Sequence, residues 1–320
     1  MSNATESSAA RQGLRHEERP ATARRRHRWA LSDRALSWLF IGPTISLLLL
    51  INIFPLFWTI YLSFTNYRAN IPIRPIRWVG LRNYTRIFES NEIWHYLQIT
   101  AHFVVWSVLL ETILGFALAL LLNRKFRGHG LLSTLLVLPM LLSPALVGLF
   151  WKYIFDPQVG VFNYIVNYLL NAGSFSMLSN PHLAPWAVVA VDVWMWTPFI
   201  MLLCLAGLQS VPDALYEAAE IDRASRWQKF WAVTFPHVLP LLSIAVLFRA
   251  MESFKVFGLV MQLTGGGPGG ATELMSVAVK RAAFVTWKTG WGAALAIVMF
   301  VIVFGASAVF VRYLNRVSQR

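Results

Sequence analysis

The sequence predicts an all-α, polytopic membrane protein with six transmembrane helices. Two observations carry this prediction. Hydrophobic residues make up 57% of the 320-residue chain and charged residues only 13%, and the mean hydropathy of +0.54 is far above that of ordinary soluble domains. Six separate stretches also reach the roughly 20 predominantly apolar residues that a helix needs to cross a bilayer. A water-soluble core could not bury this much apolar surface.

The six expected spans are residues 36–64, 96–122, 131–155, 185–208, 239–263 and 290–313. Aromatic residues gather near their ends, where amphipathic rings favour the headgroup region. Five prolines fall inside the spans: Pro43, Pro55, Pro139, Pro144 and Pro198. Each removes a helical hydrogen bond that lipid cannot replace, so the freed carbonyl must face protein or a water-filled cavity. A bundle with a hydrated interior would accommodate these prolines; the alternative is ordinary kinking, since proline is frequent in membrane helices.

The chain divides by composition into two segments. Residues 1–34 are rich in Ser, Ala, Arg and His and hold few large apolar residues, so they are predicted to form a disordered, basic cytoplasmic tail. Residues 35–320 form the predicted transmembrane domain. The first apolar run starts too late, is too long and lacks the small-residue pattern of a cleavable signal peptide, so we expect it to remain attached.

The distribution of Lys and Arg predicts the orientation. The segments on one side of the expected spans hold 8, 3, 3 and 3 of these residues, and the segments on the other side hold 5, 0 and 3. The positive-inside rule places both termini and the more basic loops in the cytoplasm. The net charge of +13 thus reports on membrane orientation, and we expect no nucleic-acid partner.

Cysteine and histidine chemistry has little support. Cys204 is the single cysteine, so no internal disulfide can form and a thiol metal site is not expected. His95 and His102 have no other ligands at metal-binding spacing. We predict no metal and no catalytic residue.

One predicted cytoplasmic loop, residues 210–236, has too few consecutive apolar residues to span the membrane. Ser210 is a plausible N-cap, followed by Pro212 in the first turn and Asp213 at the positive end of the helix dipole. Ser225 can start a second short helix, which is expected to stop before Pro236. The loop is therefore predicted to be a pair of short helices.

The faces of this helical pair suit a soluble partner. Ala214, Ala218 and Ile221 share one small face of the first helix, and Glu217 and Glu220 point elsewhere. Basic residues follow at Arg223, Arg226 and Lys229. The alternative is an amphipathic helix that lies on lipid headgroups.

Four motifs occur in order along the chain. Three of them are Trp78-Val79-Gly80-Leu81-Arg82-Asn83-Tyr84 after the first span, Trp196-Thr197-Pro198-Phe199 in the fourth, and Leu263-Thr264-Gly265-Gly266-Gly267-Pro268 in the last predicted external loop. The fourth is in the cytoplasmic loop, at Glu217-Ala218-Ala219, Asp222, Ala224, Gln228, Phe230, Pro236 and Pro240. Together they resemble the permeases of ATP-binding-cassette (ABC) sugar importers of the maltose and glycerol-3-phosphate type, and the loop motif is similar to the EAA loop of that family.

The resemblance implies the type I importer permease fold and a multi-pass subunit of the bacterial inner membrane, with both termini cytoplasmic. Such a subunit forms half of the pathway, together with a second permease subunit, usually a different chain. Two ATP-binding subunits and an external solute-binding protein that delivers the sugar complete the system. The chain has no GxxxxGK[ST] motif, so ATP is expected on the partner subunit, with no cofactor and no enzymatic activity here.

The resemblance also assigns residues to the coupling with the ATPase: Glu217, Ala218, Ala219, Asp222, Arg223 and Ala224. Glu217 is the main candidate. Arg223 departs from the family, which usually has glycine where the two short helices turn. Because arginine tolerates positive φ poorly, we expect this turn to be built differently.

Positions that line the sugar site in the relatives that have one correspond to Asp192, Trp196, Phe199, Glu252, Ser253 and Val256. Polar groups would meet sugar hydroxyls, and aromatic faces would pack on the C–H surface of the ring. In the alternative interpretation, Arg249, Glu252 and Lys255 form an ion-pair ladder inside the bundle, because buried charges are usually paired. Glu111 could pair with a neighbouring helix.

Two other classes compete with the importer. A secondary transporter or channel would use the intramembrane charges to carry ions and would not need the cytoplasmic loop. An intramembrane enzyme would need a catalytic constellation within the spans, and none stands out. The sequence does not identify the sugar or its charge.

Overall fold

The computed structural model describes residues 32–71, 73, 75–124, 126–170 and 176–318. Within these ranges the structure is helices and turns without strands, apart from one isolated bridge between Thr65 and Trp78. The chain forms two units, Met1–Pro55 and Leu56–Arg320. Nearly all of the predicted tail, residues 1–31, lies outside the described residues.

Five helices are long and apolar enough to cross a membrane, and a bent pair of helices makes a sixth span. The five are Leu36–Ser63, Asn91–Leu122, Ala184–Gln209, Arg226–Ser253 and Thr289–Arg312, and the bent pair is His129–Leu141 with Pro144–Ile154. The all-α class is confirmed for the described residues. The prediction of six spans is confirmed if the bent pair is counted as one.

Helix α1 (Asp33–Ser63) begins in the first unit, and its last eight residues belong to the second. Helix α2 (Arg82–Glu89) follows after the first loop, and α3 (Asn91–Leu122) begins directly afterwards. Ser90 separates these two helices because its backbone is extended, and its hydroxyl caps α3 by accepting from the amide of Ile93.

The third predicted span is broken rather than continuous. It consists of α4 (His129–Val137), a 3₁₀ turn η1 (Leu138–Leu141) and α5 (Pro144–Ile154), and the two halves meet at 101°. Pro139 and Pro144 lack the amide that would continue the helical ladder, and Ser143 before the second proline is extended. Helix α6 (Val161–Leu170) follows α5.

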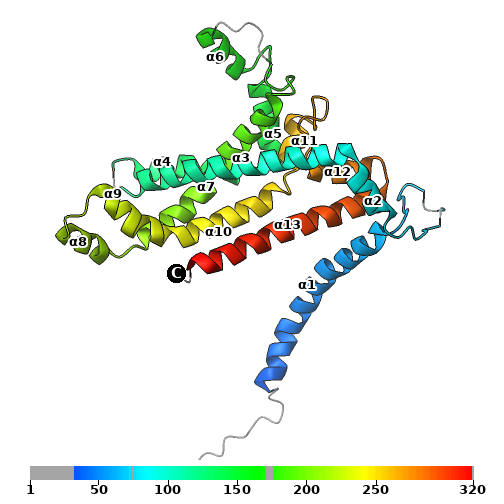
Figure 1. Cartoon of the computed structure of the whole chain (residues 1–320), viewed down its shortest axis with the longest axis horizontal. Coiled ribbons are helices and arrows are strands. Elements are labelled where there is room, and N and C mark those ends of the chain that lie inside the picture. The colour runs from blue at the N-terminus through cyan, green and yellow to red at the C-terminus, as the bar shows by residue number, and fades with distance from the viewer. Residues whose placement is uncertain (1–31, 72, 74, 125, 171–175, 319–320) are drawn as a thin grey trace, which may run out of the picture. The chain divides into compact units, whose positions relative to one another are not determined.

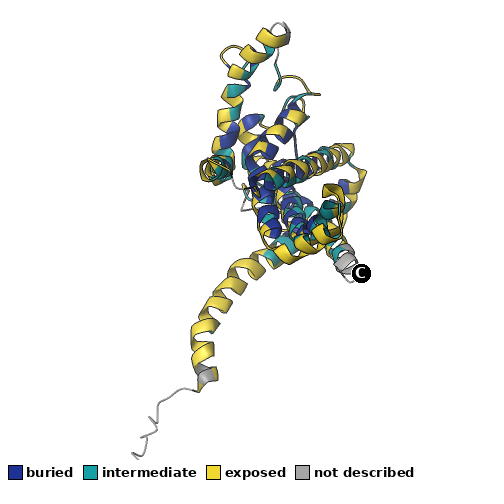
Figure 2. Cartoon of the chain, turned by 90° about the vertical axis from the view of Figure 1, so that its left-hand side faces the viewer, coloured by how far each residue is buried: buried dark blue, intermediate teal, exposed yellow. Residues whose placement is uncertain are grey.

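The core of the second unit lies where α3, α7 (Ala184–Gln209) and α10 (Phe235–Ser253) pack side by side (Figure 1). Buried residues gather in this region (Figure 2). Two cores follow these helices, one around Phe103, Val188 and Val191 and the other around Ile200 and Val238.

The fifth predicted span, 239–263, has different ends in the structure. Helix α10 already ends at Ser253, and residues 258–263 form the separate helix α11 (Gly258–Leu263). Helix α11 packs against α5 so closely that a Cβ on Gly148 would lie 2.6 Å from the carbonyl oxygen of Leu259. Hydropathy could not locate this break, because it records composition and not the direction of the backbone.

Helices α8 (Asp213–Ile221) and α9 (Arg226–Lys229) lie at one end of the packed helices. Helices α2, α11 and α12 (Met275–Lys280) lie at the opposite end (Figure 1). A π-helical segment η3 (Arg281–Val285) and the long α13 (Thr289–Ser318) complete the chain. The predicted coupling loop and the glycine-rich loop are therefore at opposite ends of the bundle.

Candidate functional site

The loop between α7 and α10 forms the predicted pair of short helices, but the first one starts later than expected. Ser210 does not cap α8. Its backbone is helical and its hydroxyl donates to the carbonyl of Gly207, 2.8 Å away, so this residue closes α7. Pro212 occupies the N-cap position of α8 in an extended conformation.

The turn after α8 keeps the glycine-like geometry despite the arginine. Arg223 adopts a φ of +53°. The amide of Arg223 donates to Glu220 at 3.0 Å, and the amide of Ala224 donates to Ala219 at 2.9 Å. These two hydrogen bonds make a Schellman motif, in which a residue of left-handed conformation ends the helix. The expectation that Arg223 would build a different turn is therefore wrong, because the two backbone bonds hold the left-handed conformation.

The second short helix begins where the sequence predicts. Ser225 caps α9 by accepting from the amide of Gln228, whose side chain accepts in return from the amide of Ser225 at 2.8 Å. This reciprocal pair is a capping box.

The helix does not stop before Pro236, contrary to prediction. It continues through the π-helical segment η2 (Phe230–Thr234) into α10. Within η2 the amide of Phe235 reaches the carbonyl of Phe230, one residue further back than in an α-helix. The wider turn accommodates Pro236, which has no amide and whose ring would crowd a regular turn.

Two side-chain contacts hold the loop together. Lys229 pairs with Glu220 at 2.8 Å, which joins α9 to the end of α8. This hydrogen bond from Lys229 lowers the pKa of Glu220. The hydroxyl of Tyr216 lies 3.0 Å from that of Thr234, which joins α8 to η2. Glu217 takes part in neither contact.

The surface of the loop exposes large hydrophobic side chains as well as charged ones. The exposed hydrophobic side chains are Leu215, Ile221, Trp227 and Trp231, and Glu217 is exposed too. Ile221 is 83% exposed and Trp227 is 70% exposed. The small face predicted on α8 is also uncovered, since Ala214 and Ala218 are exposed.

A second constellation lies in the middle of the bundle. Arg249 on α10 is 1% exposed and bonds to carboxylates on two other helices. Its Nε and Nη2 lie 2.6 and 2.7 Å from the two oxygens of Glu111 on α3, and its Nη2 also lies 2.5 Å from Asp192 on α7. The guanidinium lies 5.1 Å above the ring of Trp196. The pairing of Glu111 with a neighbouring helix is confirmed.

The ladder on α10 does not form as a set of three. Glu252 and Lys255 pair with each other at 2.5 Å, and their side chains are 59% and 54% exposed. Arg249 instead crosses to the neighbouring helices. Sequence spacing along one helix favoured the ladder, whereas the stronger partners of Arg249 come from residues 57 and 138 positions away.

A cavity of about 290 Å³ adjoins this cluster, between the start of α5, α7 and the end of α10. Four of the six predicted substrate positions line it: Asp192, Trp196, Glu252 and Val256. The other two do not. Phe199 packs against the core around Ile200 and Val238. The buried hydroxyl of Ser253 donates to the carbonyl of Arg249 at 2.8 Å. Arg249 and Lys255 also line the cavity, although neither was among the predicted substrate residues.

The tryptophan-led motif after the first span closes the end of α1. Asn83 is buried and donates to the carbonyls of Ser63 and Thr65, at 2.8 and 3.0 Å. Trp78 stacks on Phe64 at 5.2 Å between ring centroids. These contacts satisfy carbonyls that the end of a helix leaves without partners.

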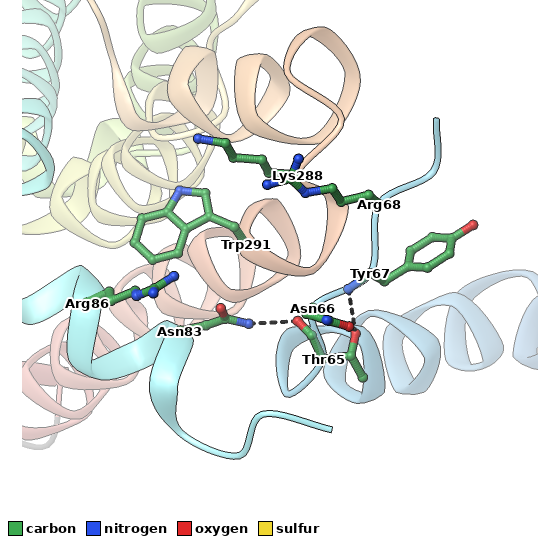
Figure 3. Close-up of a pocket in the computed structure, with 8 residues that line it drawn as sticks. All are labelled: Thr65, Asn66, Tyr67, Arg68, Asn83, Arg86, Lys288 and Trp291. Atoms are coloured by element: carbon green, nitrogen blue, oxygen red, sulfur yellow. Dashed lines mark hydrogen bonds between the residues drawn. The ribbon is translucent and has the colours of Figure 1, made fainter. Parts of the chain in front are cut away.

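Beside this closure lies a cavity of about 320 Å³ (Figure 3). It has three basic residues and no carboxylate among its lining residues. Arg68 follows α1, Arg86 comes from α2 and Lys288 precedes α13. The amide of Gly290 at the start of α13 donates to the carbonyl of Tyr67, so this end of α13 is fixed to the first loop.

The glycine-rich loop is braced by its threonines. Gly265 and Gly266 have φ of +63° and +91°, which a side chain would oppose. The hydroxyls of Thr264 and Thr272 lie 2.7 Å apart, and that of Thr272 donates to the carbonyl of Gly267 at 2.6 Å. Among the described residues, no group of three or more metal-binding side chains gathers.

The fold and these sites define a polytopic membrane protein with a two-helix loop at one end and a cavity lined by charged and apolar side chains between its helices. Residues 111–318 match the family model of the binding-protein-dependent transport system inner membrane component. The chain belongs to this family, and it is a permease subunit of an ABC importer. Membership replaces the alternatives of a secondary transporter, a channel or an intramembrane enzyme.

Curated relatives and solved structures agree with this assignment. The chain is 37% identical to the trehalose/maltose transport system permease protein MalF of Thermococcus litoralis, over 88% of this chain and 94% of that protein. It is 29% identical to the sn-glycerol-3-phosphate transport system permease protein UgpA of Agrobacterium fabrum, over 89% and 96%. A chain of a bacterial ABC transporter involved in the import of the acidic polysaccharide alginate has the same fold, with a TM-score of 0.73 and 22% identity. The match covers 87% of this chain and 96% of that chain.

Proposed function

We propose that this chain forms one half of the transmembrane pathway of an ATP-driven carbohydrate importer. The relatives' names support a carbohydrate cargo, since they include trehalose and maltose, starch degradation products and sulfoquinovosyl glycerol. The cavity beside Trp196 has the composition that a sugar site needs, with carboxylates for hydroxyl groups and an aromatic face for a ring.

The observation that carries the proposal is the exposed loop of α8 and α9. The Schellman turn, the capping box and the pair between Glu220 and Lys229 give it a defined shape. Exposed apolar side chains together with the exposed Glu217 suit a groove on a soluble partner. That partner is the ATPase, which carries the ATP, and this chain needs no cofactor of its own.

Coupling works because α9, η2 and α10 form one continuous helix. A force on the loop is transmitted along this helix to Arg249, which joins α10 to α3 and α7. ATP binding and the loaded binding protein must each favour one state of the bundle, since equal affinity for both states shifts nothing. In this mechanism Glu217, Ala218, Ala219, Asp222, Arg223 and Ala224 form the contact with the ATPase.

The working assembly pairs this chain with a second permease subunit of different sequence, two ATP-binding subunits and an external solute-binding protein. Both termini of the chain and the loop 210–236 face the cytoplasm, with residues 1–34 as a tail and residues 35–320 as the transmembrane domain. The excess of Lys and Arg on this side supports the orientation.

The test uses the complete transporter in proteoliposomes and measures ATP hydrolysis stimulated by the loaded binding protein. Glu217→Lys is expected to abolish the stimulated hydrolysis and uptake while the chain still inserts. Asp213→Lys is the matched control, because it makes the same charge change one turn earlier on α8. Equal loss in both variants, or uptake unchanged by Glu217→Lys, would remove Glu217 from the coupling contact.

A further inference from the structure

We infer that the cavity beside Trp196 accepts uncharged, hydroxyl-rich cargo and disfavours anionic cargo, and that Glu111 and Glu252 determine this specificity. The inference rests on the proposed function, because it takes the cavity as a cargo site. The relatives' names leave the charge of the cargo open, since maltose is neutral and glycerol-3-phosphate is anionic.

Each cation in the wall of the cavity already has a carboxylate partner. Arg249 makes three charge-assisted hydrogen bonds of 2.5–2.7 Å to Glu111 and Asp192, and all three side chains are at least 98% buried. Lys255 bonds to Glu252 at 2.5 Å. Among the described lining residues, no other Lys or Arg is present to bind an anion.

The carboxylates outnumber the cations near the cavity. Two cations stand against the three carboxylates of Glu111, Asp192 and Glu252, so neither cation is left to pair with an anionic cargo. An anionic cargo would have to displace a carboxylate from its partner. At distances of about 10 Å and an effective dielectric constant of about 20, one unit charge changes affinity by about tenfold.

A neutral polyol meets no such barrier. The carboxylates of Asp192 and Glu252 line the cavity and can accept hydrogen bonds from hydroxyl groups. Trp196, beneath the guanidinium of Arg249, supplies an aromatic ring in the same wall. These are the groups that fix a sugar without requiring a charge on it.

Glu111 acts through Arg249 and does not line the cavity. Its bidentate pair orients the guanidinium and neutralises it from the side of α3. Glu111 is therefore a positioning residue. Glu252 lines the cavity and neutralises Lys255 directly. The two carboxylates provide independent tests of the same inference.

The experiment measures equilibrium sugar binding to the complete permease–ATPase complex in nanodiscs, without binding protein and without ATP. The probes are trehalose, maltose and sucrose, each paired with a derivative in which one primary alcohol is oxidised to a carboxylate. At least one neutral sugar is expected to bind, with a Kd about tenfold or more below that of its acid.

Glu252→Gln removes an exposed carboxylate, so it should not disturb the fold. It is expected to reduce the ratio of the Kd of the acid to the Kd of the neutral sugar by about tenfold. Glu111→Gln is expected to reduce this ratio by the same factor. Lys255→Gln is the matched control and should not reduce it. A purely structural role would weaken both probes equally and leave the ratio unchanged. An acid that binds the unmodified complex as tightly as its neutral counterpart, a ratio unmoved in both Gln variants, or no binding of any sugar would overturn the inference. None of these outcomes affects the Glu217 test, which measures ATP hydrolysis.

Discussion

Arg249 of α10 and Glu111 of α3 form a bidentate ion pair, with nitrogen–oxygen distances of 2.6 and 2.7 Å, although 138 residues separate them in the chain. The pair is almost completely buried. A buried guanidinium requires such partners because removing a charge from water without compensation costs several kcal/mol. The contact ties α10, which follows the coupling loop, to α3, in which the match to the family model begins.

Removing the arginine should be far more damaging than breaking the exposed pair nearby. Arg249→Ala leaves Glu111 and Asp192 buried without their cation, and we expect a loss of about 3–5 kcal/mol in the free energy of unfolding. Glu252→Gln breaks a pair that is more than half exposed and should cost less than about 1 kcal/mol. Denaturant unfolding in detergent micelles measures both, and equal losses would contradict the assignment of the buried cluster as the structural centre.

Asn83→Ala should loosen the end of α1. The variant leaves the carbonyls of Ser63 and Thr65 without their donor, which we expect to cost about 1–3 kcal/mol. Hydrogen exchange at the amides of the first loop should accelerate. Thr85→Ala, which loses only a local bond to the carbonyl of Arg82, is the control. Unchanged exchange in Asn83→Ala would show that this asparagine does not hold the closure.

Arg223→Gly should preserve the turn between α8 and α9. Glycine adopts the observed φ of +53° without the cost of a side chain, so stimulated ATP hydrolysis is expected to stay within about twofold of the unmodified protein. Arg223→Val should impair it, because a β-branched residue is strained at positive φ. A large loss in the glycine variant would instead mean that coupling needs the charge of Arg223 and not only the turn that its backbone forms.

The contact of α3 with α7 should not tolerate a methyl group at Gly115. A Cβ there would lie 2.9 Å from the Cβ of Ile200, so Gly115→Ala is expected to destabilise by about 1–3 kcal/mol. Gly130 in α4 has nothing within 4 Å of an added Cβ, and Gly130→Ala should be neutral or stabilising by up to about 1 kcal/mol. Thermal unfolding compares the two, and a reversed order would exclude this close approach.

The pair between Glu220 and Lys229 should respond to acid. The hydrogen bond from Lys229 lowers the pKa of Glu220 in the folded loop. The contribution of this pair to the stability of the loop is therefore complete above a pH of about 4.3, the pKa of an unfolded glutamate. It is lost as the pH falls through the lower, folded value. Spin labels on α8 and α9 should keep their separation between pH 7 and pH 5 and move apart only below about pH 4. Glu220→Gln should abolish this transition; a change above pH 5 would contradict the stated direction.

Sequence patterns predicted the features that depend on neighbouring residues. Ser225 and Gln228 form their capping box because both partners lie within one helical turn. The spans form because backbone groups in lipid must bond within their own segment. Ser210 shows the limit of local reasoning, since whether its hydroxyl accepts at the start of α8 or donates at the end of α7 depends on where the preceding helix stops.

The sequence by itself determined the class of protein and the approximate positions of the spans and the loop, because hydropathy and capping act over a few residues. Only the tertiary structure decided the partner of Arg249. Spacing on α10 pointed to Glu252, whereas packing of α3 and α7 brought Glu111 and Asp192 to the guanidinium. The physical reason is that a buried charge is stabilised by whichever opposite charges surround it in space, and no local pattern records which distant helices will pack there.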